Sequence, residues 1–156
     1  MEHKHNDQMG NHHYIMLGVS TAISAVIMYV SMFAMIDTGQ DFFNNLNMIY
    51  MALLMAVPMV ILMLLFMGSM YSDKRTNTVL YALSALIFLG SLAGIRLQTA
   101  VGDKQFLKSM IPHHSGAILM CRQAQIKDPE ITKLCGDIVK SQREEISQMR
   151  KILSRL

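Results

Sequence analysis

Soft and polar side chains gather at two places in the last third of the chain, where the helical pattern would otherwise be apolar. They belong to Met110, His113 and His114 in one segment, and to Gln142, Glu145 and Met149 in the next. At about 100° per residue, the two histidines flank the apolar stripe of the first segment, and the second group lies inside the stripe of its own segment. Thioether and imidazole groups together favour copper, whereas imidazole with carboxylate would equally suit zinc or iron. The pattern predicts a metal site.

A structural interpretation of the same residues stays open. A single histidine at the edge of a core is usually hydrogen-bonded, and methionine on an apolar stripe usually packs. Burying imidazole, amide and carboxylate groups together is costly unless something pairs with them. Either a metal ion or a hydrogen-bonded network of histidine and glutamate would satisfy these groups.

Two helices joined by a short turn are expected to carry these groups. Asp103 can cap or open the first helix, and Asp128 followed by Pro129 is typical of the start of the second. Pro112 is expected to kink the first helix beside the histidines. The expected core consists of Phe106, Met110, Ala117, Cys121 and Ala124 in the first helix, and Ile131, Leu134, Ile138, Met149, Ile152 and Leu156 in the second. So short a connection predicts an antiparallel hairpin.

Folding this hairpin about its turn brings pairs of side chains to similar levels. The pairs are Met110 with Met149, His114 with Glu145, and Cys121 with Cys135. A disulfide between the cysteines is plausible in an oxidising compartment, and a Cu(I) thiolate site is the alternative. We favour structural cysteines, either bridged or buried.

Three long apolar runs precede the hairpin. With 52% hydrophobic and 16% charged residues, the chain is less charged than an ordinary soluble domain, for which about 25% is typical. Each run reaches the roughly 20 residues needed to cross a bilayer. We expect transmembrane helices at about 14–36, 46–71 and 77–97, the third continuing as one helix into the C-terminal segment. The expected parts are a His-rich tail at 1–13, a transmembrane region at 14–97 and a hairpin at 98–156. A cleaved signal peptide is the competing interpretation of the first run.

Basic residues beside the runs predict the orientation. The loop after the second run contains Lys74 and Arg75, whereas the loop after the first contains Asp37, Asp41 and no basic residue. Because cytoplasmic loops carry the excess of Lys and Arg, the second loop is expected to be cytoplasmic. The N-terminus then lies in the cytoplasm and the hairpin outside, which for the inner membrane of a bacterium means the periplasm.

The C-terminal segment also resembles a known family. Met-Ile-Pro-His-His at 110–114, Asp-Pro-Glu-Ile at 128–131 and the stretch from Gln142 to Met149 are similar to the family called domain of unknown function 305. The resemblance covers nearly all of 103–156 and implies half of a ferritin-like bundle, with a link to copper binding and copper tolerance in the bacterial periplasm. It implies that the ligands or their neighbours are Met110, His113, His114, Met120, Gln142, Glu145 and Met149. The two cysteines are not part of the family's pattern.

Further sulfur and imidazole groups lie outside the hairpin. The chain has 16 methionines, and in the second run Met51, Met55 and Met59 recur every fourth residue. This row either packs or faces lipid, or it forms a ladder that hands Cu(I) along the membrane. Together with Gly90 and Gly94, whose spacing is typical of close helix packing, it is similar to the architecture of the copper transporter family Ctr. The tail adds His3, His5, His12 and His13, and short His-rich tracts commonly bind metal.

The fold class that these features predict is all-α, with three transmembrane helices followed by a soluble antiparallel hairpin. A two-helix hairpin cannot bury its stripe alone, so we expect a homo-oligomer, a dimer before a trimer, that completes a ferritin-like bundle. The small net charge of +3, with no basic stripe, argues against binding to nucleic acid.

The expected function is that of a non-enzymatic inner-membrane protein that binds copper, with Cu(I) favoured, and that sequesters or relays it or confers copper tolerance. A metal-dependent redox enzyme of ferritin-like type is one alternative, disfavoured because the Glu-x-x-His pattern of di-iron bundles is missing from the hairpin at 98–156. A Cu(I) transporter that uses the methionine row is the other.

Overall fold

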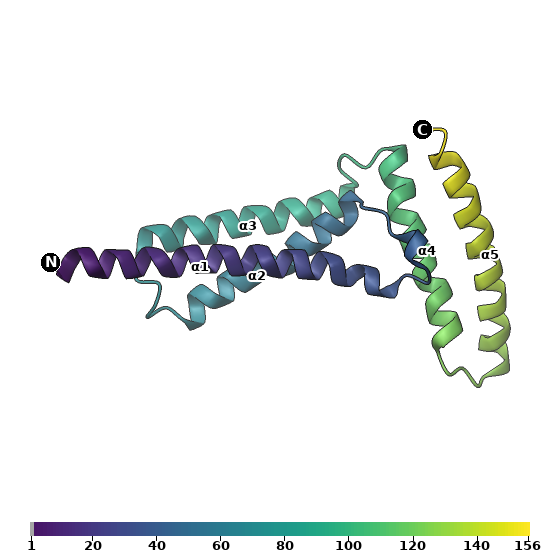
Figure 1. Ribbon diagram of the computed structural model, residues 1–156, viewed down its shortest axis with the longest axis horizontal. Helices are drawn as coiled ribbons and strands as arrows, with labels where there is room; N and C mark the ends of the chain where they lie inside the picture. The colour runs from purple at the N-terminus through teal and green to yellow at the C-terminus, as the bar shows by residue number, and fades with distance from the viewer. Residues whose placement is uncertain (1) are drawn as a thin grey trace. The chain divides into compact units, whose positions relative to one another are not determined.

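The chain is helical through nearly all of its described part. The computed structural model describes the backbone of residues 2–156 and the side chains of residues 12–156. Five α-helices and two short 3-10 helices follow one another in this part, and no strand occurs in it. They are α1 (Glu2–Ser31), η1 (Met32–Met35), η2 (Gly39–Asp41), α2 (Leu46–Phe66), α3 (Lys74–Leu97), α4 (Asp103–Gln123) and α5 (Pro129–Leu153) (Figure 1). The predicted all-α class is confirmed.

The contacts divide the chain into two compact units. The first comprises the residues up to Val30 together with Ile49–Thr99, and we call it the membrane unit. The second comprises Ser31–Met48 together with Ala100–Leu156, and we call it the C-terminal unit. Within this unit, we call Ser31–Met48 the connector.

All three predicted spans are helices that are long and apolar enough to cross a membrane. They extend over His12–Met35, Leu46–Phe66 and Lys74–Leu97. The second helix ends before the predicted residue 71, because residues 67–70 form a turn in which the Met70 amide donates to the Met67 carbonyl at 2.9 Å. The third begins before residue 77, because the Asp73 carboxylate caps it by accepting the Arg75 amide at 3.0 Å.

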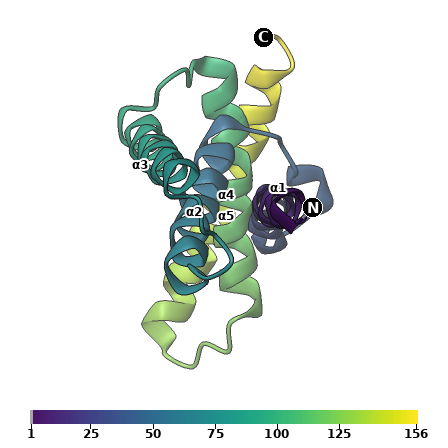
Figure 2. The same cartoon turned by 90° about the vertical axis from the view of Figure 1, so that its left-hand side faces the viewer.

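Buried residues join the three helices of the membrane unit. Leu17 on α1 packs with Val60 and Leu64 on α2 and with Tyr71, and Leu80 on α3 covers this cluster. Figure 2 looks nearly along the axis of α1, with α2 and α3 beside it.

One close contact between α2 and α3 involves half of the glycine pair. Gly94 is buried, and a Cβ atom there would lie 3.0 Å from the ring of Tyr50. The Tyr50 hydroxyl donates to the Thr99 carbonyl at 2.9 Å, which fixes the ring. At Gly90 no atom of another helix lies within 4 Å of the corresponding position. The predicted close packing is therefore confirmed at Gly94 and not at Gly90.

The helix is interrupted between α3 and α4, so the prediction of one continuous helix is wrong. Gln98 ends α3 in the left-handed conformation, with φ of 50°, and Ala100 follows with φ of 59°. The Thr99 amide donates back to the Gly94 carbonyl at 3.1 Å. Two left-handed residues turn the backbone away from the helix axis, and α4 starts afresh after Gly102 at its N-cap.

In the C-terminal unit, α4 and α5 run antiparallel and lie side by side (Figure 1). The helix start predicted for the second segment is confirmed, because the Asp128 carboxylate accepts the amides of Glu130 at 2.8 Å and Ile131 at 3.0 Å. α4 runs through Pro112 as a single helix. The core of the pair joins Ile111 and Ile118 of α4 to Ile146 of α5.

The predicted core of these two helices is partly wrong. Five residues expected inside it are exposed, namely Phe106, Ala124, Ile131, Leu134 and Leu156. The buried residues Leu107, Ile111, Ile118 and Ile146 replace them. The reason is that α4 packs against α5 on one flank and against η1 and η2 of the connector on the other. Its buried stripe is therefore wider and rotated relative to a simple hairpin.

Candidate functional site

His114 lies at the centre of the contact between α4 and α5. Its residue is 9% exposed. The Nδ1 atom lies 2.9 Å from the Met110 carbonyl oxygen, and the Nε2 atom lies 2.7 Å from Oε2 of Glu145. Both ring nitrogens therefore face acceptors, and the imidazolium form can donate to both. The prediction that His114 and Glu145 lie at the same level of the two helices is confirmed.

Glu145 is held on its other side by the helix that carries it. Ser141 donates its hydroxyl to Oε1 of Glu145 at 2.7 Å. This hydrogen bond, followed by the one from His114, holds the pKa of the Glu145 carboxyl below its usual range, and desolvation opposes them. The side chain is a carboxylate at neutral pH, although 46% of it is exposed. The network of histidine and glutamate considered from the sequence is thus present.

The His114–Glu145 contact fixes the register of the two helices. Met110 precedes His114 by four residues, and Met149 follows Glu145 by four, so each lies one turn along the same face of its helix. Because the helices are antiparallel, Met110 and Met149 lie on the same side of the His114–Glu145 contact along the helix pair. Met110 and Met149 are both half-buried, and Met149 packs against the core at Ile146.

The remaining predicted ligands of the C-terminal unit are not gathered around His114. His113 points to the surface, with its ring centroid 6.0 Å from that of His114. Met120 is 53% exposed, and Gln142 is half-buried. Within the described residues, no three His, Cys, Asp or Glu side chains are close enough together to hold a metal ion.

A polar clamp that no sequence pattern predicted fastens the connector to α4 and α5. Asp41 is 4% exposed. It accepts from the hydroxyls of Ser115 at 2.6 Å and Thr38 at 2.9 Å, and from Nη2 of Arg150 at 2.5 Å. Ser115, fully buried, also accepts the backbone amide of Asp37 at 2.7 Å.

Three further contacts extend this clamp along α4. Arg122 donates to both carboxylate oxygens of Asp37, at 2.9 and 3.1 Å. At the other end of the connector, the buried Asn45 accepts from the Ser109 hydroxyl at 3.2 Å, and Gln105 accepts the Leu46 amide at 3.2 Å. The signal for the clamp was a pair of acids, Asp37 and Asp41, in a short loop between apolar runs. Their charge predicts the orientation of the loop and does not reveal its partners on α4 and α5.

Comparison with known proteins identifies this region. Residues 89–153, from the last part of α3 to the end of α5, match the family described as Domain of unknown function (DUF305). The uncharacterized protein L153 of Acanthamoeba polyphaga mimivirus is 31% identical over 147 residues, which are 93% of this chain and 93% of that protein. The chain belongs to the DUF305 family. Its similarity to the mimivirus protein extends beyond the DUF305 segment into the apolar helices and the connector. No solved structure matches the chain.

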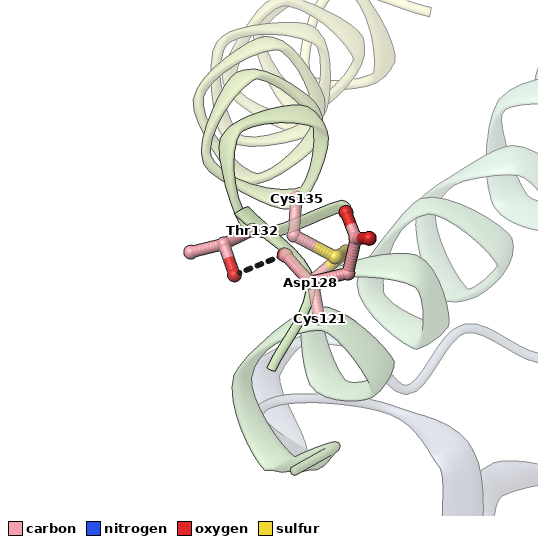
Figure 3. Close-up of a disulfide and its surroundings, with 4 residues drawn as sticks. All are labelled: Cys121, Asp128, Thr132 and Cys135. Carbon is pink, nitrogen blue, oxygen red and sulfur yellow. Dashed lines mark hydrogen bonds between the residues drawn. A yellow bond between two sulfur atoms is a disulfide. The ribbon is translucent and has the colours of Figure 1, made fainter. Parts of the chain in front are cut away.

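The DUF305 segment carries both cysteines, and the structure joins them. Cys121 and Cys135 form a disulfide between α4 and α5, with their Cα atoms 5.2 Å apart (Figure 3). Beside it, Thr132 donates its hydroxyl to the Asp128 carbonyl at 2.8 Å. The favoured structural role of these cysteines agrees with this bond. As a disulfide, neither sulfur is a thiolate ligand.

The additional candidate ligands outside the DUF305 segment are separate from His114 in sequence. Met51, Met55 and Met59 are between 41% and 49% exposed on α2. His12 is exposed and His13 half-buried, with ring centroids 6.4 Å apart. The side chains of His3 and His5 lie outside the described residues.

Proposed function

We propose that this DUF305 protein is an integral membrane protein that binds copper as Cu(I) in its C-terminal unit and sequesters or relays it. The observation that carries the proposal is the register of α4 and α5, in which Met110 and Met149 each lie one turn from the His114–Glu145 contact. Two thioethers near an imidazole suit a soft ion better than zinc or iron. The proposal depends on these methionines as donors, and it assigns the chain binding and not catalysis.

The His114–Glu145 pair has a positioning role in this proposal. Residues that hold a ligating imidazole through its second nitrogen fix its orientation and raise its basicity. Here the Met110 carbonyl and Glu145 hold the two nitrogens, and Ser141 holds Glu145 in turn. A cation can bind when one of these hydrogen bonds gives way, and the Glu145 carboxylate supplies negative charge beside it.

The contacts within the C-terminal unit support a membrane topology with three spans. The connector precedes α2, and the DUF305 helices follow α3, so two apolar helices separate the two segments in the chain. Asp41 of the connector nevertheless bonds Arg150 of α5, which requires both segments to lie on one side of a membrane. Two crossings of the membrane between them, by α2 and α3, satisfy this condition. The disulfide favours an oxidising side, which we propose is the periplasmic side of a bacterial inner membrane, with the N-terminus in the cytoplasm.

Exposed apolar residues on α4 and α5 support self-association. Large apolar side chains of this pair are about half exposed, namely those of Phe106, Met120, Ile131, Leu134 and Leu156. A second copy of the same pair would cover such side chains and complete a four-helix bundle, so we propose a dimer. Chemical cross-linking in mild detergent is expected to trap it, and a result with monomers alone would contradict it.

The methionine row gives no comparable support for transport. Met51, Met55 and Met59 lie on the exposed surface of α2. None of them lines the apolar cavity of about 360 Å³ that lies between the helices of the membrane unit. Contact with lipid or with another helix accounts for their positions.

Metal analysis of the purified chain tests the proposed function. The full chain in mild detergent, with its disulfide intact, is expected to bind copper, and His114→Ala is expected to bind less. His113→Ala tests the exposed neighbour in the same way. The control is Met16→Leu on the exposed surface of α1, which should leave the copper stoichiometry of the chain unchanged. If His114→Ala retains the full copper stoichiometry, the proposed site is wrong.

A further inference from the structure

The disulfide lies at the edge of a hollow near the turn between α4 and α5. Cys121 and Cys135 are both half-buried, so their sulfurs are neither sealed in the core nor fully in solvent. They line a cavity of about 360 Å³, and its other lining residues are Ala124, Ile126, Thr132, Gly136 and Val139. Apart from the neighbouring residues and the helix's own backbone, no atom lies within 4 Å of the position that a Cβ at Gly136 would take, so the hollow is open beside Cys135. A small reductant or a metal ion can therefore reach the pair.

The two helices do not depend on the disulfide alone for their contact. Ile111, Ile118 and Ile146 join them through the core, and His114 bonds Glu145 across the interface. The cap of α5 at Asp128 holds the turn. After reduction, the two cysteines would therefore remain opposite each other, with their backbones at the separation of 5.2 Å seen in the bonded form.

We propose that Cys121 and Cys135, when reduced, form a second soft-metal site that takes one Cu(I) ion between two thiolates. Thiolates are the protein ligands that most strongly favour Cu(I). In the first step two molecules of a small thiol are oxidised to their disulfide, while the protein disulfide takes up two electrons and two protons. In the second step Cu(I) binds both sulfurs and displaces the two thiol protons to solvent.

This site is distinct from the one proposed around His114. Cys121 follows His114 by seven residues, which is about 10 Å along the axis of α4. The donors differ as well, since the cysteine site needs reduction and the methionine site does not. The chain would then bind different amounts of Cu(I) in its oxidised and reduced forms.

A Cu(I) titration of the full chain in mild detergent tests this proposal. A phosphine reductant is removed after use, and Cu(I) is supplied without oxygen in competition with a chromogenic chelator. The reduced wild type is expected to bind one more Cu(I) per chain than the oxidised wild type. In Cys121→Ser with Cys135→Ser, phosphine treatment should produce no gain. No gain in the wild type, or the same gain in the double variant, would overturn the proposal.

Two further measurements test whether the helix pair survives reduction and whether a reductant reaches the disulfide through the hollow. Helix content by circular dichroism should stay the same on reduction, and its loss would show that the disulfide alone holds the pair. Gly136→Leu fills the open approach and should slow reduction by dithiothreitol several-fold, so an unchanged rate would contradict access through the hollow. Copper bound by the oxidised chain tests the proposed function separately, because only the gain on reduction depends on the cysteines.

Discussion

Replacing Asp41 by asparagine is expected to release the connector from α4 and α5. The side chain keeps its size but loses its charge, and one of its two oxygens becomes an amide group that donates. Both oxygens now accept, from Ser115 and Thr38 on one side and from Arg150 on the other. At least one of these three donors must lose its partner in the variant.

The size of the effect follows from the burial of the two charges. The Asp41 side chain is 6% exposed and that of Arg150 is 35% exposed. Breaking a buried ion pair by removing one partner costs about 3–5 kcal/mol. Because water can reach a third of Arg150, we take a value at or just below the low end of this range, about 2–3 kcal/mol. At about 1.4 kcal/mol for each factor of ten, local opening should become roughly 30- to 150-fold more frequent.

Hydrogen–deuterium exchange followed by mass spectrometry measures this opening in detergent. Backbone amides of the connector, among them that of Asp37, should exchange faster in Asp41→Asn by the stated factor. Amides of the membrane unit should keep their rates. The matched control is Asp137→Asn, which makes the same chemical change at an exposed position of α5. Connector exchange that matches the control would refute the role given to the clamp.

Two further predictions concern packing and pH. Gly94→Leu should lower the thermal midpoint, because overpacking against the Tyr50 ring costs about 1–3 kcal/mol, whereas Gly90→Leu should change it less; equal shifts would contradict the packing described. The lowered pKa of Glu145, caused first by the Ser141 hydroxyl, contributes stability above the ordinary carboxyl pKa and loses it as pH falls through the folded value. Ser141→Ala should therefore have a lower thermal midpoint than the wild type at pH 7, and the two midpoints should converge in acid. A difference in midpoint that persists in acid would show that the effect does not come from the Glu145 pKa.

Periodicity and local signals predicted much of the fold. The apolar runs gave the three candidate spans, Asp128 gave the start of α5, and antiparallel folding brought Cys121 beside Cys135 and His114 beside Glu145. Each of these depends on residues that are close in the chain or on a single short turn. Such features are visible in a sequence without knowledge of distant neighbours.

The connector and the exact core of α4 were not predictable in the same way. Asp41 and Arg150 are 109 residues apart, and Asp41 and Ser115 are 74 apart. No local pattern says that a short acidic loop will dock on α4 and widen its buried stripe. The break after α3 was also hidden, because left-handed backbone at Gln98 and Ala100 occurs without glycine.

Cu(I) affinity is the most direct test of the proposed copper site. Competition with a chromogenic chelator measures it in the full chain with the disulfide intact. Exchange of methionine for leucine nearly conserves volume, so Met110→Leu with Met149→Leu removes two thioethers and keeps the core. We predict that this variant binds Cu(I) about tenfold more weakly or worse, a loss of about 1.4 kcal/mol or more, while Met16→Leu on the exposed surface of α1 binds as the wild type does. Equal affinity in the wild type and the double variant would contradict the account.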